Sequence, residues 1–337
     1  MPTKTYNGIN GQTLVKTVDD IYQASTKWRK NQFLLPTGQC GKDCIKLSTE
    51  WLNQFNNKTC FEGIALKVLM VIPNLMLQKP SARSKTKDHS ERLTARLKLW
   101  NEGKLNEIWK EVATIQKKLQ ASKKKQRTDE DISRVFSKLM LEGKVGAALK
   151  FLEEQSENAV LKPTTDIVKK LEALHPEANT VEPETLIQGP REEVPPAYFY
   201  CIDELHIFKA ANQTKGSGGP SQQDAQQWKR MLCSNKFKSE SKDLREEMAK
   251  FARRIASETI DPSSLEAYVA GRLIPLNKNP GGEDIQVRPI GLGEVMRRIV
   301  GKAISWCLQD DIQQAAGPLQ VSAGLKGGAE AAIQYMQ

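Results

Sequence analysis

Two cations flank a glycine-containing turn between residues 272 and 293, and this arrangement could bind phosphates. Short apolar runs at Leu273–Leu276 and Ile285–Ile290 are joined by the residues Asn-Pro-Gly-Gly at 279–282, which predicts a β-hairpin with a loop longer than two residues. Lys278 lies on the first arm and Arg288 on the second. Cations on facing strands, beside glycines that let a backbone approach closely, can hold a phosphate chain. The same pattern also fits an exposed hairpin with two solvated charges.

The elements around this hairpin must position its cations. A helix is expected after Gly293, because apolar residues recur at 295/296, 299/300, 303/304 and 307/308 and Gly317-Pro318 is a normal helix stop. A glycine-rich loop at 319–328 then opens an alanine-rich helix. Before the hairpin, helices are expected at about 221–232 and 241–257, followed by a third that Asp261 caps. The loop at 215–220 contains three glycines and is expected to be flexible, but it lacks the P-loop pattern.

Three blocks of this region together resemble the fingers region of reverse transcriptases from non-LTR retrotransposons and related retroelements. They are RLIPLNKNPG at 272–281, VRPIGLGEVMRRIVGKA at 287–303 and PLQVSAGLKGGAEAAI at 318–333. The resemblance covers about residues 216–337. Weaker similarity extends it back to about residue 75, through LQKPSARSKTKDHSERLTARLKLWNEGK at 77–104 and LMLEGKVGAALKFL at 139–152.

This resemblance implies roles for particular residues. Arg288 would contact the phosphates of an incoming nucleotide or stack near its base, and Lys278 would supply a second cation for the triphosphate or the template. Lys326 would touch the backbone of template or primer. Cations on the helix after the hairpin are further candidates for nucleotide or template contact, although an exposed helix face explains them equally; they are Arg297, Arg298 and Lys302.

The carboxylates that this family needs for nucleotidyl transfer are missing from the sequence. They hold two metal ions and come from a D-x-x-N-A-F-N-like strand and a YxDD-like pair, which would follow Gln337. Asp310-Asp311 is the one Asp-Asp pair in this half of the chain, and we expect it on a helix surface. We therefore expect a truncated reverse transcriptase, an RNA-directed DNA polymerase fragment that binds RNA or an RNA/DNA hybrid without sequence preference.

Such a fragment should not polymerise alone. We expect no cofactor on this chain, and Mg²⁺ only with the missing palm or a partner chain that supplies it. The alternative is a helical module that binds nucleic acid or protein and has no polymerase role.

Charge is unevenly distributed along this basic chain, whose net charge is +10. Residues 79–127 hold 15 Lys and Arg against 5 Asp and Glu, whereas residues 153–204 hold 4 against 12. In the basic stretch, Arg92, Arg96 and Lys110 fall largely between apolar positions of amphipathic helices, which is typical of a solvated face. Contact with a nucleic-acid backbone is the competing interpretation, and it would be strongly salt-dependent. The residues expected to contact the backbone are Lys123, Lys124, Lys125 and Arg127.

The cysteines indicate no oxidising compartment, and we expect all six to be free thiols, as in an intracellular protein. Cys40 and Cys44, with Cys60, form the one grouping with metal-like spacing, but no histidine lies near it, so ordinary packing is favoured. No apolar run is long enough to cross a membrane; Ile64–Leu77 contains Lys67, Pro73 and Asn74 and is expected to be a buried helix.

The fold class is expected to be mainly α with a small β-hairpin (α+β), in which a helical N-terminal region precedes a partial fingers subdomain. Tyr198–Tyr200 could stack bases, but docking onto a core is favoured. No internal repeat is apparent. Composition divides the chain into an N-terminal region with modest helices at 1–78, a basic helical region at 79–155, an acidic proline-rich connector at 156–215 and the partial reverse transcriptase domain, with fingers and the start of the palm, at 216–337.

Overall fold

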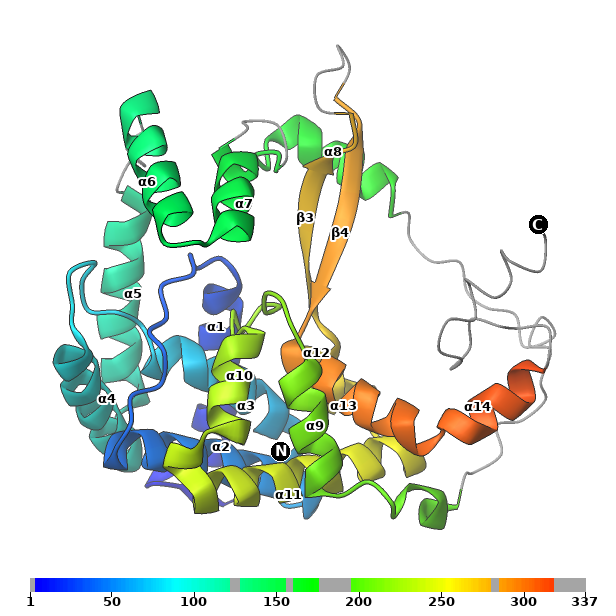
Figure 1. Ribbon diagram of the computed structural model, residues 1–337. Coiled ribbons are helices and arrows are strands. Elements are labelled where there is room, and N and C mark those ends of the chain that lie inside the picture. The colour runs from blue at the N-terminus through cyan, green and yellow to red at the C-terminus, as the bar shows by residue number, and fades with distance from the viewer. Residues whose placement is uncertain (1–3, 122–127, 156–159, 176–194, 280–284, 318–337) are drawn as a thin grey trace. The chain divides into compact units, whose positions relative to one another are not determined.

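The computed structural model describes residues 4–121, 128–155, 160–175, 195–279 and 285–317. The chain is mainly helical, with two small antiparallel β-hairpins (Figure 1). The predicted fold class, mainly α with a small β part, is confirmed. Contacts along the chain divide it into two compact units. The first comprises residues 1–116, 192–270 and 293–337, and the second comprises residues 117–191 and 271–292.

The first unit begins with the strands β1 (Thr5–Tyr6) and β2 (Ile9–Asn10), which pair so that Thr5 faces Asn10. Helices follow from three separate stretches of chain. They are α1 (Gly11–Thr26), α2 (Gln39–Asn56), α3 (Glu62–Met76), α4 (Thr86–Asn101) and most of α5 (Leu105–Ala121); then η2 (Pro196–Phe199), α9 (Glu204–Gln213), α10 (Ala225–Cys233), η3 (Asn235–Phe237), α11 (Lys238–Ser257) and α12 (Pro262–Val269); and finally α13 (Val295–Cys307) and α14 (Gln309–Ala316).

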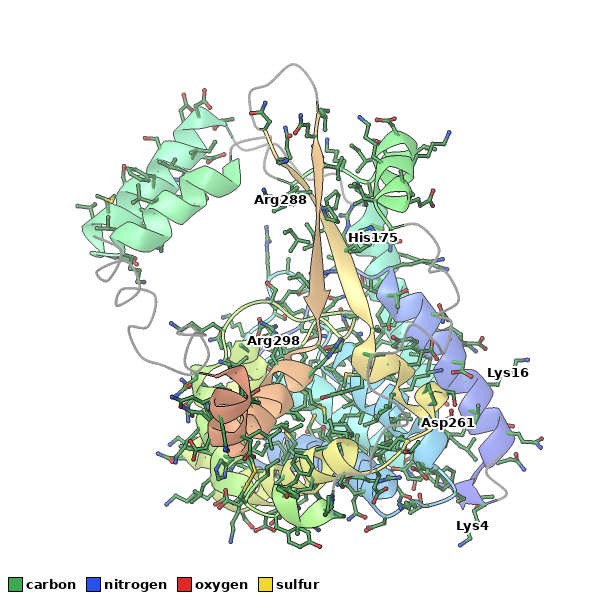
Figure 2. All side chains as sticks on the ribbon, turned by 90° about the vertical axis from the view of Figure 1, so that its right-hand side faces the viewer. Lys4, Lys16, His175, Asp261, Arg288 and Arg298 are labelled. Carbon is green, nitrogen blue, oxygen red and sulfur yellow. A yellow bond between two sulfur atoms is a disulfide. The ribbon has the colours of Figure 1, made fainter. Side chains whose placement is uncertain are left out.

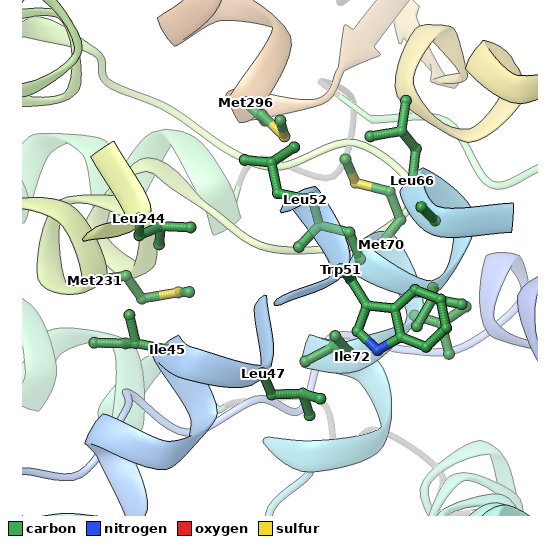
Figure 3. Close-up of a cluster of buried hydrophobic side chains, with 14 of the residues drawn as sticks. Ile45, Leu47, Trp51, Leu52, Leu66, Met70, Ile72, Met231, Leu244 and Met296 are labelled. Atoms are coloured by element: carbon green, nitrogen blue, oxygen red, sulfur yellow. The ribbon is translucent and has the colours of Figure 1, made fainter. Parts of the chain in front are cut away.

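Helix α3 is the centre of the first unit. Every residue from Ile64 to Met76 is buried except Lys67. A helix that is apolar on all sides must be surrounded by other elements, and α1, α2 and α12 pack around it. The buried helix predicted at Ile64–Leu77 is therefore confirmed. Apolar side chains from α2, α3, α10, α11 and α13 close this core, including Trp51, Leu52, Met70, Met231, Leu244 and Met296 (Figure 3).

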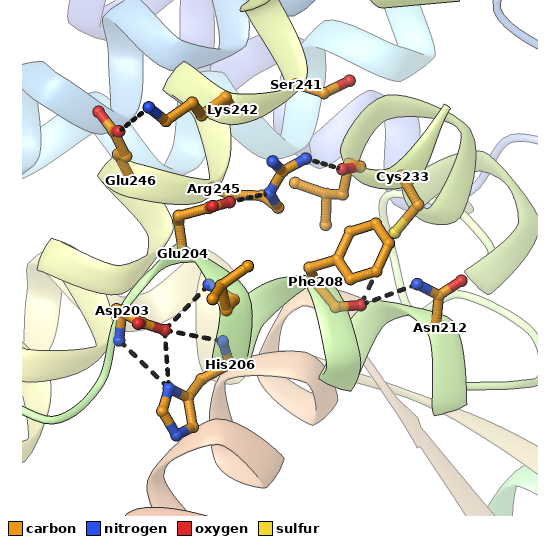
Figure 4. Close-up of polar contacts among 12 residues, drawn as sticks. Asp203, Glu204, His206, Phe208, Asn212, Cys233, Ser241, Lys242, Arg245 and Glu246 are labelled. Carbon is orange, nitrogen blue, oxygen red and sulfur yellow. Dashed lines mark hydrogen bonds and ion pairs between the residues drawn. The ribbon is translucent and has the colours of Figure 1, made fainter. Parts of the chain in front are cut away.

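Charged side chains fasten the surrounding helices to one another. On α11, Arg245 donates to the Glu204 carboxylate of α9 at 2.5 Å and to the Leu232 carbonyl of α10 at 2.5 Å (Figure 4). Its guanidinium also lies 5.4 Å from the centre of the Phe208 ring. One arginine thus joins three helices through a carboxylate, a carbonyl and an aromatic face.

Arg96 is fully buried, although its position in α4 predicted a solvated charge. Its side chain donates to the carbonyl of Met76 at 2.9 Å, to that of Gln78 at 2.8 Å and to the Glu111 carboxylate at 2.8 Å. The last carbonyls of a helix have no partner within the helix. Arg96 supplies one at the end of α3, which is the physical reason for its burial.

The second unit contains α6 (Asp129–Leu141), α7 (Val145–Gln155), α8 (Thr165–Ala173) and the strands β3 (Gly271–Asn277) and β4 (Val287–Gly293). Helices α6 and α7 pack on each other. Thr128 and Thr164 cap α6 and α8, because each hydroxyl accepts the backbone N–H three residues ahead. The hairpin predicted around residues 279–282 is formed by β3 and β4.

Two further sequence expectations are wrong. The first is the set of free thiols, because Cys201 and Cys307 form a disulfide across 106 residues. The second is the single helix between Gly293 and Gly317. It is two helices, since the backbone leaves helical dihedrals at Leu308, and the acidic pair Asp310-Asp311 then occupies the first turn of α14, where negative charge favours a helix start.

The described helices include none with the length and apolar character that crossing a bilayer requires.

Candidate nucleic-acid interface

One hydrogen bond establishes how the strands of the β3–β4 hairpin face each other. The backbone N–H of Lys278 donates to the carbonyl of Gln286 at 2.7 Å. Counting from this bond along an antiparallel pair places Leu276 opposite Arg288 and Pro275 opposite Pro289. The strand bounds fit this register, because Gly271 at the start of β3 then faces Gly293 at the end of β4.

Both prolines fit this register without the loss of a ladder bond. Since residues 278 and 286 form a hydrogen-bonded pair, the pair Pro275 and Pro289 is non-hydrogen-bonded, and its backbone groups point away from the partner strand. The carbonyl of Pro275 accordingly accepts an outside donor, the N–H of Leu161, at 2.9 Å. Because proline has no backbone N–H, it is tolerated at these non-hydrogen-bonded positions of the strands.

The register places both predicted cations on one face of the hairpin. Lys278 follows the last residue of β3, and Gln286 precedes the first residue of β4. Continuing the alternation of the strands by one residue puts Lys278, Gln286 and Arg288 on the same side of the hairpin. Lys278 and Arg288 are diagonal neighbours, a relation in which Cα atoms are about 7–8 Å apart. Both side chains are exposed, and Arg288 projects from the hairpin (Figure 2). The glycines of the turn lie outside the described residues.

Other parts of the second unit support both arms of the hairpin. Val160 bridges to Leu276, beside the bond from Leu161 to Pro275. On α8, the Lys170 ammonium lies 3.5 Å from the Ile285 carbonyl and 3.5 Å from the Asp166 carboxylate. The hairpin is thus held along β3 and at the residue before β4, while the side chains of Lys278 and Arg288 remain exposed.

Cations of α13, predicted to contact nucleic acid, donate to backbone carbonyls of the first unit. Arg298 binds two carbonyls of the loop after α9 (Figure 2 labels this arginine). At least part of the donor capacity of these side chains therefore serves the fold, and their contact with nucleic acid stays a prediction. The contacts are Arg298 to Lys215, at 2.7 Å, and to Ser217; Arg297 to Val269, at 3.3 Å; and Lys302 to Gln213, at 3.2 Å.

The glycine-rich loop at 215–220, predicted to be flexible, is fastened to the start of α13. The buried Glu294 carboxylate accepts the N–H of Ser221 at 2.7 Å and its hydroxyl at 2.6 Å. A Cβ on Gly218 would lie 2.4 Å from the Gln223 carbonyl oxygen, and one on Gly219 would lie 2.9 Å from the Glu294 nitrogen. These glycines serve close packing, and the sequence signal that was missed is the glutamate 73 residues further on.

The segment at 198–200 divides its aromatic side chains between core and solvent. Phe199 is buried, which fits the predicted docking, whereas Tyr198 and Tyr200 are 60% and 70% exposed. Alternation within a single 3₁₀ turn explains the difference, because one ring points inward and its two neighbours do not.

The three cysteines with metal-like spacing in the sequence are core packing residues or surface thiols. Cys40 and Cys44 are buried in the core, and Cys60 is exposed. Burial raises the pKa of the Cys44 thiol to about 12, so it stays protonated at neutral pH. Across the part of the chain that the structure describes, no three His, Cys, Asp or Glu side chains gather as metal ligands would.

The remaining predicted contacts lie outside the described residues; they are Lys123, Lys124, Lys125, Arg127 and Lys326.

Comparison with known proteins adds no relative. No family model, no curated protein and no solved structure matches this chain. The resemblance to reverse transcriptases therefore rests on the sequence blocks alone.

Proposed function

We propose that this chain binds nucleic acid through the β3–β4 hairpin, and that it is a fragment of a reverse transcriptase whose hairpin contacts the nucleotide or the template. The observation that carries the proposal is the shared face of Lys278 and Arg288. Two exposed cations on one face of a hairpin that other parts of the second unit support suit a phosphate backbone. The net charge of +10 favours the same partner.

The proposed activity is binding, and polymerisation is not expected of this chain alone. Nucleotidyl transfer of this family requires carboxylates that hold two Mg²⁺ ions, and the sequence contains neither of the motifs that would supply them. Primer extension with Mg²⁺ or Mn²⁺ should give no product, so incorporation by the pure chain would contradict this part of the proposal.

Salt-dependent binding tests the hairpin directly. Affinity for a labelled RNA and for an RNA/DNA hybrid is measured by fluorescence anisotropy over a series of salt concentrations. The double variant Lys278→Ala/Arg288→Ala should flatten the slope of log K against log salt by about 1.4, since each lost phosphate contact on a single strand removes about 0.7. Exposed lysines of the first unit that lie outside the basic stretch provide the matched control, Lys4→Ala/Lys16→Ala, which should keep the slope of the parent chain.

The alternative, a helical module without a polymerase role, predicts a different result in the same assay. There the basic stretch would carry binding, so changing Lys123, Lys124 and Lys125 to alanine would abolish it while the hairpin variant bound normally. A normal slope for the hairpin variant would overturn the proposal. The charge-preserving change Arg288→Lys then separates a simple cation from a bidentate arginine contact.

A further inference from the structure

One disulfide joins two parts of the first unit that lie far apart in the chain. Cys201 stands between η2 and α9, and Cys307 is the last residue of α13, 106 residues later. Cys201 is exposed and Cys307 is half-buried, so a dissolved thiol can reach the bond while the chain remains folded. Exposed disulfides are the ones that exchange readily with thiols.

The Tyr198 carbonyl oxygen lies beside both sulfur atoms of this disulfide. It is 3.2 Å from the Cys307 Sγ and 3.9 Å from the Cys201 Sγ. A sulfur atom in a disulfide carries no hydrogen, whereas a thiol has one to donate. The Tyr198 oxygen is therefore an acceptor that only the reduced cysteines use, and the site provides a bonding arrangement for each redox state.

Both segments that carry these cysteines are anchored to the core without the disulfide. Phe199 and Ile202 are buried on either side of Cys201, and Arg253 of α11 donates to the Ile202 carbonyl. On α13, the buried residues run from the start of the helix to Ala303, one turn before its end. These contacts do not involve sulfur, so they persist when the disulfide opens.

The end of α13 depends on the disulfide more than its beginning does. Residues 304–308 are half-buried or exposed, in contrast to the buried face before them. Helix α14 follows directly and buries none of its residues. The bond at Cys307 therefore restrains the part of α13 that the core holds least.

We propose that Cys201 and Cys307 form a thiol–disulfide switch, which fastens the end of α13 when oxidised and releases it when reduced, while the core of the first unit stays folded. The switch does not depend on the proposed nucleic-acid binding.

The reductant of this switch is a dithiol. Its thiolate attacks the exposed Cys201 sulfur, the S–S bond breaks, and Cys307 leaves as a thiolate that takes up a proton. The second thiolate of the reductant then attacks the mixed disulfide and releases Cys201, which is protonated in turn. The protein gains two electrons and two protons, and the dithiol becomes a disulfide.

The rate at which the folded chain is reduced tests whether the bond is open to a reductant. Dithiothreitol is added to the oxidised full chain, aliquots are alkylated, and peptide mass spectrometry follows Cys201 and Cys307. The rate should rise in proportion to the dithiothreitol concentration, whereas Cys60, an exposed free thiol, should be labelled from the start. A rate that levels off at that of global unfolding would contradict the proposal. So would a pair that stays reduced after treatment with oxidised glutathione.

Hydrogen exchange compares the two redox states of the full chain. On reduction, amides of residues 304–308 should exchange about tenfold faster or more, because the cross-link no longer opposes local opening. Amides of α3 should keep their rates, and reoxidation should restore slow exchange at 304–308. Faster exchange of α3 would show that the bond holds the whole core, and equal exchange at 304–308 would show that it holds nothing; either result overturns the switch.

Substitution of the pair locates the redox response. Cys201→Ser/Cys307→Ser should match the reduced parent at residues 304–308 and should no longer respond to dithiothreitol. The matched control is Cys60→Ser, which removes an exposed thiol outside the pair and should keep the full response. A response that survives in the double variant would assign the effect to another group and refute the proposal. Since the reduced parent needs no substitution, the comparison of redox states remains decisive if the variant does not fold.

Discussion

At the scale of single residues, burial gives the side chains of this protein properties that their type alone does not indicate. Arg96 stands among the cations of an amphipathic helix, yet it is fully buried and binds two carbonyls at the end of α3. Burial lowers its pKa, while the nearby Glu111 carboxylate opposes that effect. Helix periodicity places a residue on a face, but the neighbouring helix end decides whether that face meets solvent.

Cys44 makes stability depend on alkaline pH. Burial raises its pKa from 9.0 to about 12, so the unfolded chain releases the thiol proton at lower pH than the folded chain. The contribution to stability is complete below pH 9 and is lost as pH rises from 9 towards 12, at about 1.4 kcal/mol per pH unit. Burial also raises the pKa of Tyr268, which adds to the loss above pH 10.

Urea unfolding at pH values from 8 to 11 measures this effect. The free energy of unfolding should fall less steeply between pH 9 and 10 in Cys44→Ala than in the parent chain. Cys60→Ala, which removes an exposed thiol, is the control for the loss of a cysteine. Equal slopes for Cys44→Ala and the parent would show that the thiol does not contribute.

At the scale of elements, the sequence identified those whose signals are local. Helix α12 begins where Asp261 was expected to cap it, with the carboxylate 3.0 Å from the N–H of Ser263. The β3–β4 hairpin lies where apolar arms flank a glycine turn. In contrast, β1 and β2 are two residues each, too short for any periodic pattern, and they exist because Asn7 and Tyr6 contact Trp100 far along the chain.

Two helix ends carry the same turn, Glu-Gly-Lys, at 102–104 and at 142–144, and the glycine of each has a positive φ. The same substitution should nevertheless lower the free energy of unfolding by different amounts at the two glycines. Alanine at Gly143 should cost about 1–2 kcal/mol from its left-handed backbone alone. Alanine at Gly103 should cost at least about 1 kcal/mol more, because its Cβ would displace the Asn7 carbonyl and the hydrogen bond from Asn7 to Trp100.

Tryptophan fluorescence separates the two effects, because all six tryptophans belong to the first unit. Gly103→Ala should lower the urea midpoint of the fluorescence transition, whereas Gly143→Ala should leave it in place and alter the transition seen by circular dichroism. Equal shifts of the fluorescence midpoint in the two variants would argue against separate units.

At the scale of the whole molecule, each compact unit is assembled from separated stretches of chain. The first combines residues 1–116 with 192–270 and 293–337, while the hairpin at 271–292 belongs with 117–191. Composition indicated segments in chain order, since charge and proline content vary along the sequence. Contacts between distant stretches depend on which apolar faces pack together, and composition does not indicate which faces these are.

Hydrogen exchange of the full chain should show this organisation. Amides of α3 should exchange slowest in the first unit, because the helix is buried all round and opens only with the unit as a whole. Amides of α14, which buries no residue, should exchange faster by several orders of magnitude. Amides of β3 and β4 should exchange by an opening that leaves α3 protected. One common exchange rate for α3, β3 and β4 would contradict the division into two units.

The sequence by itself determined the helical class, the hairpin with its pair of cations, and the cap of α12 at Asp261, because each depends on residues within a few positions of one another. The tertiary structure alone decided that Lys278 and Arg288 share a face, that Arg298 and Glu294 hold the glycine-rich loop, and that Arg96 is buried. It also decided which of two matching turns is covered. These outcomes depend on strand register and on partners tens of residues away, and a local pattern contains no information about either.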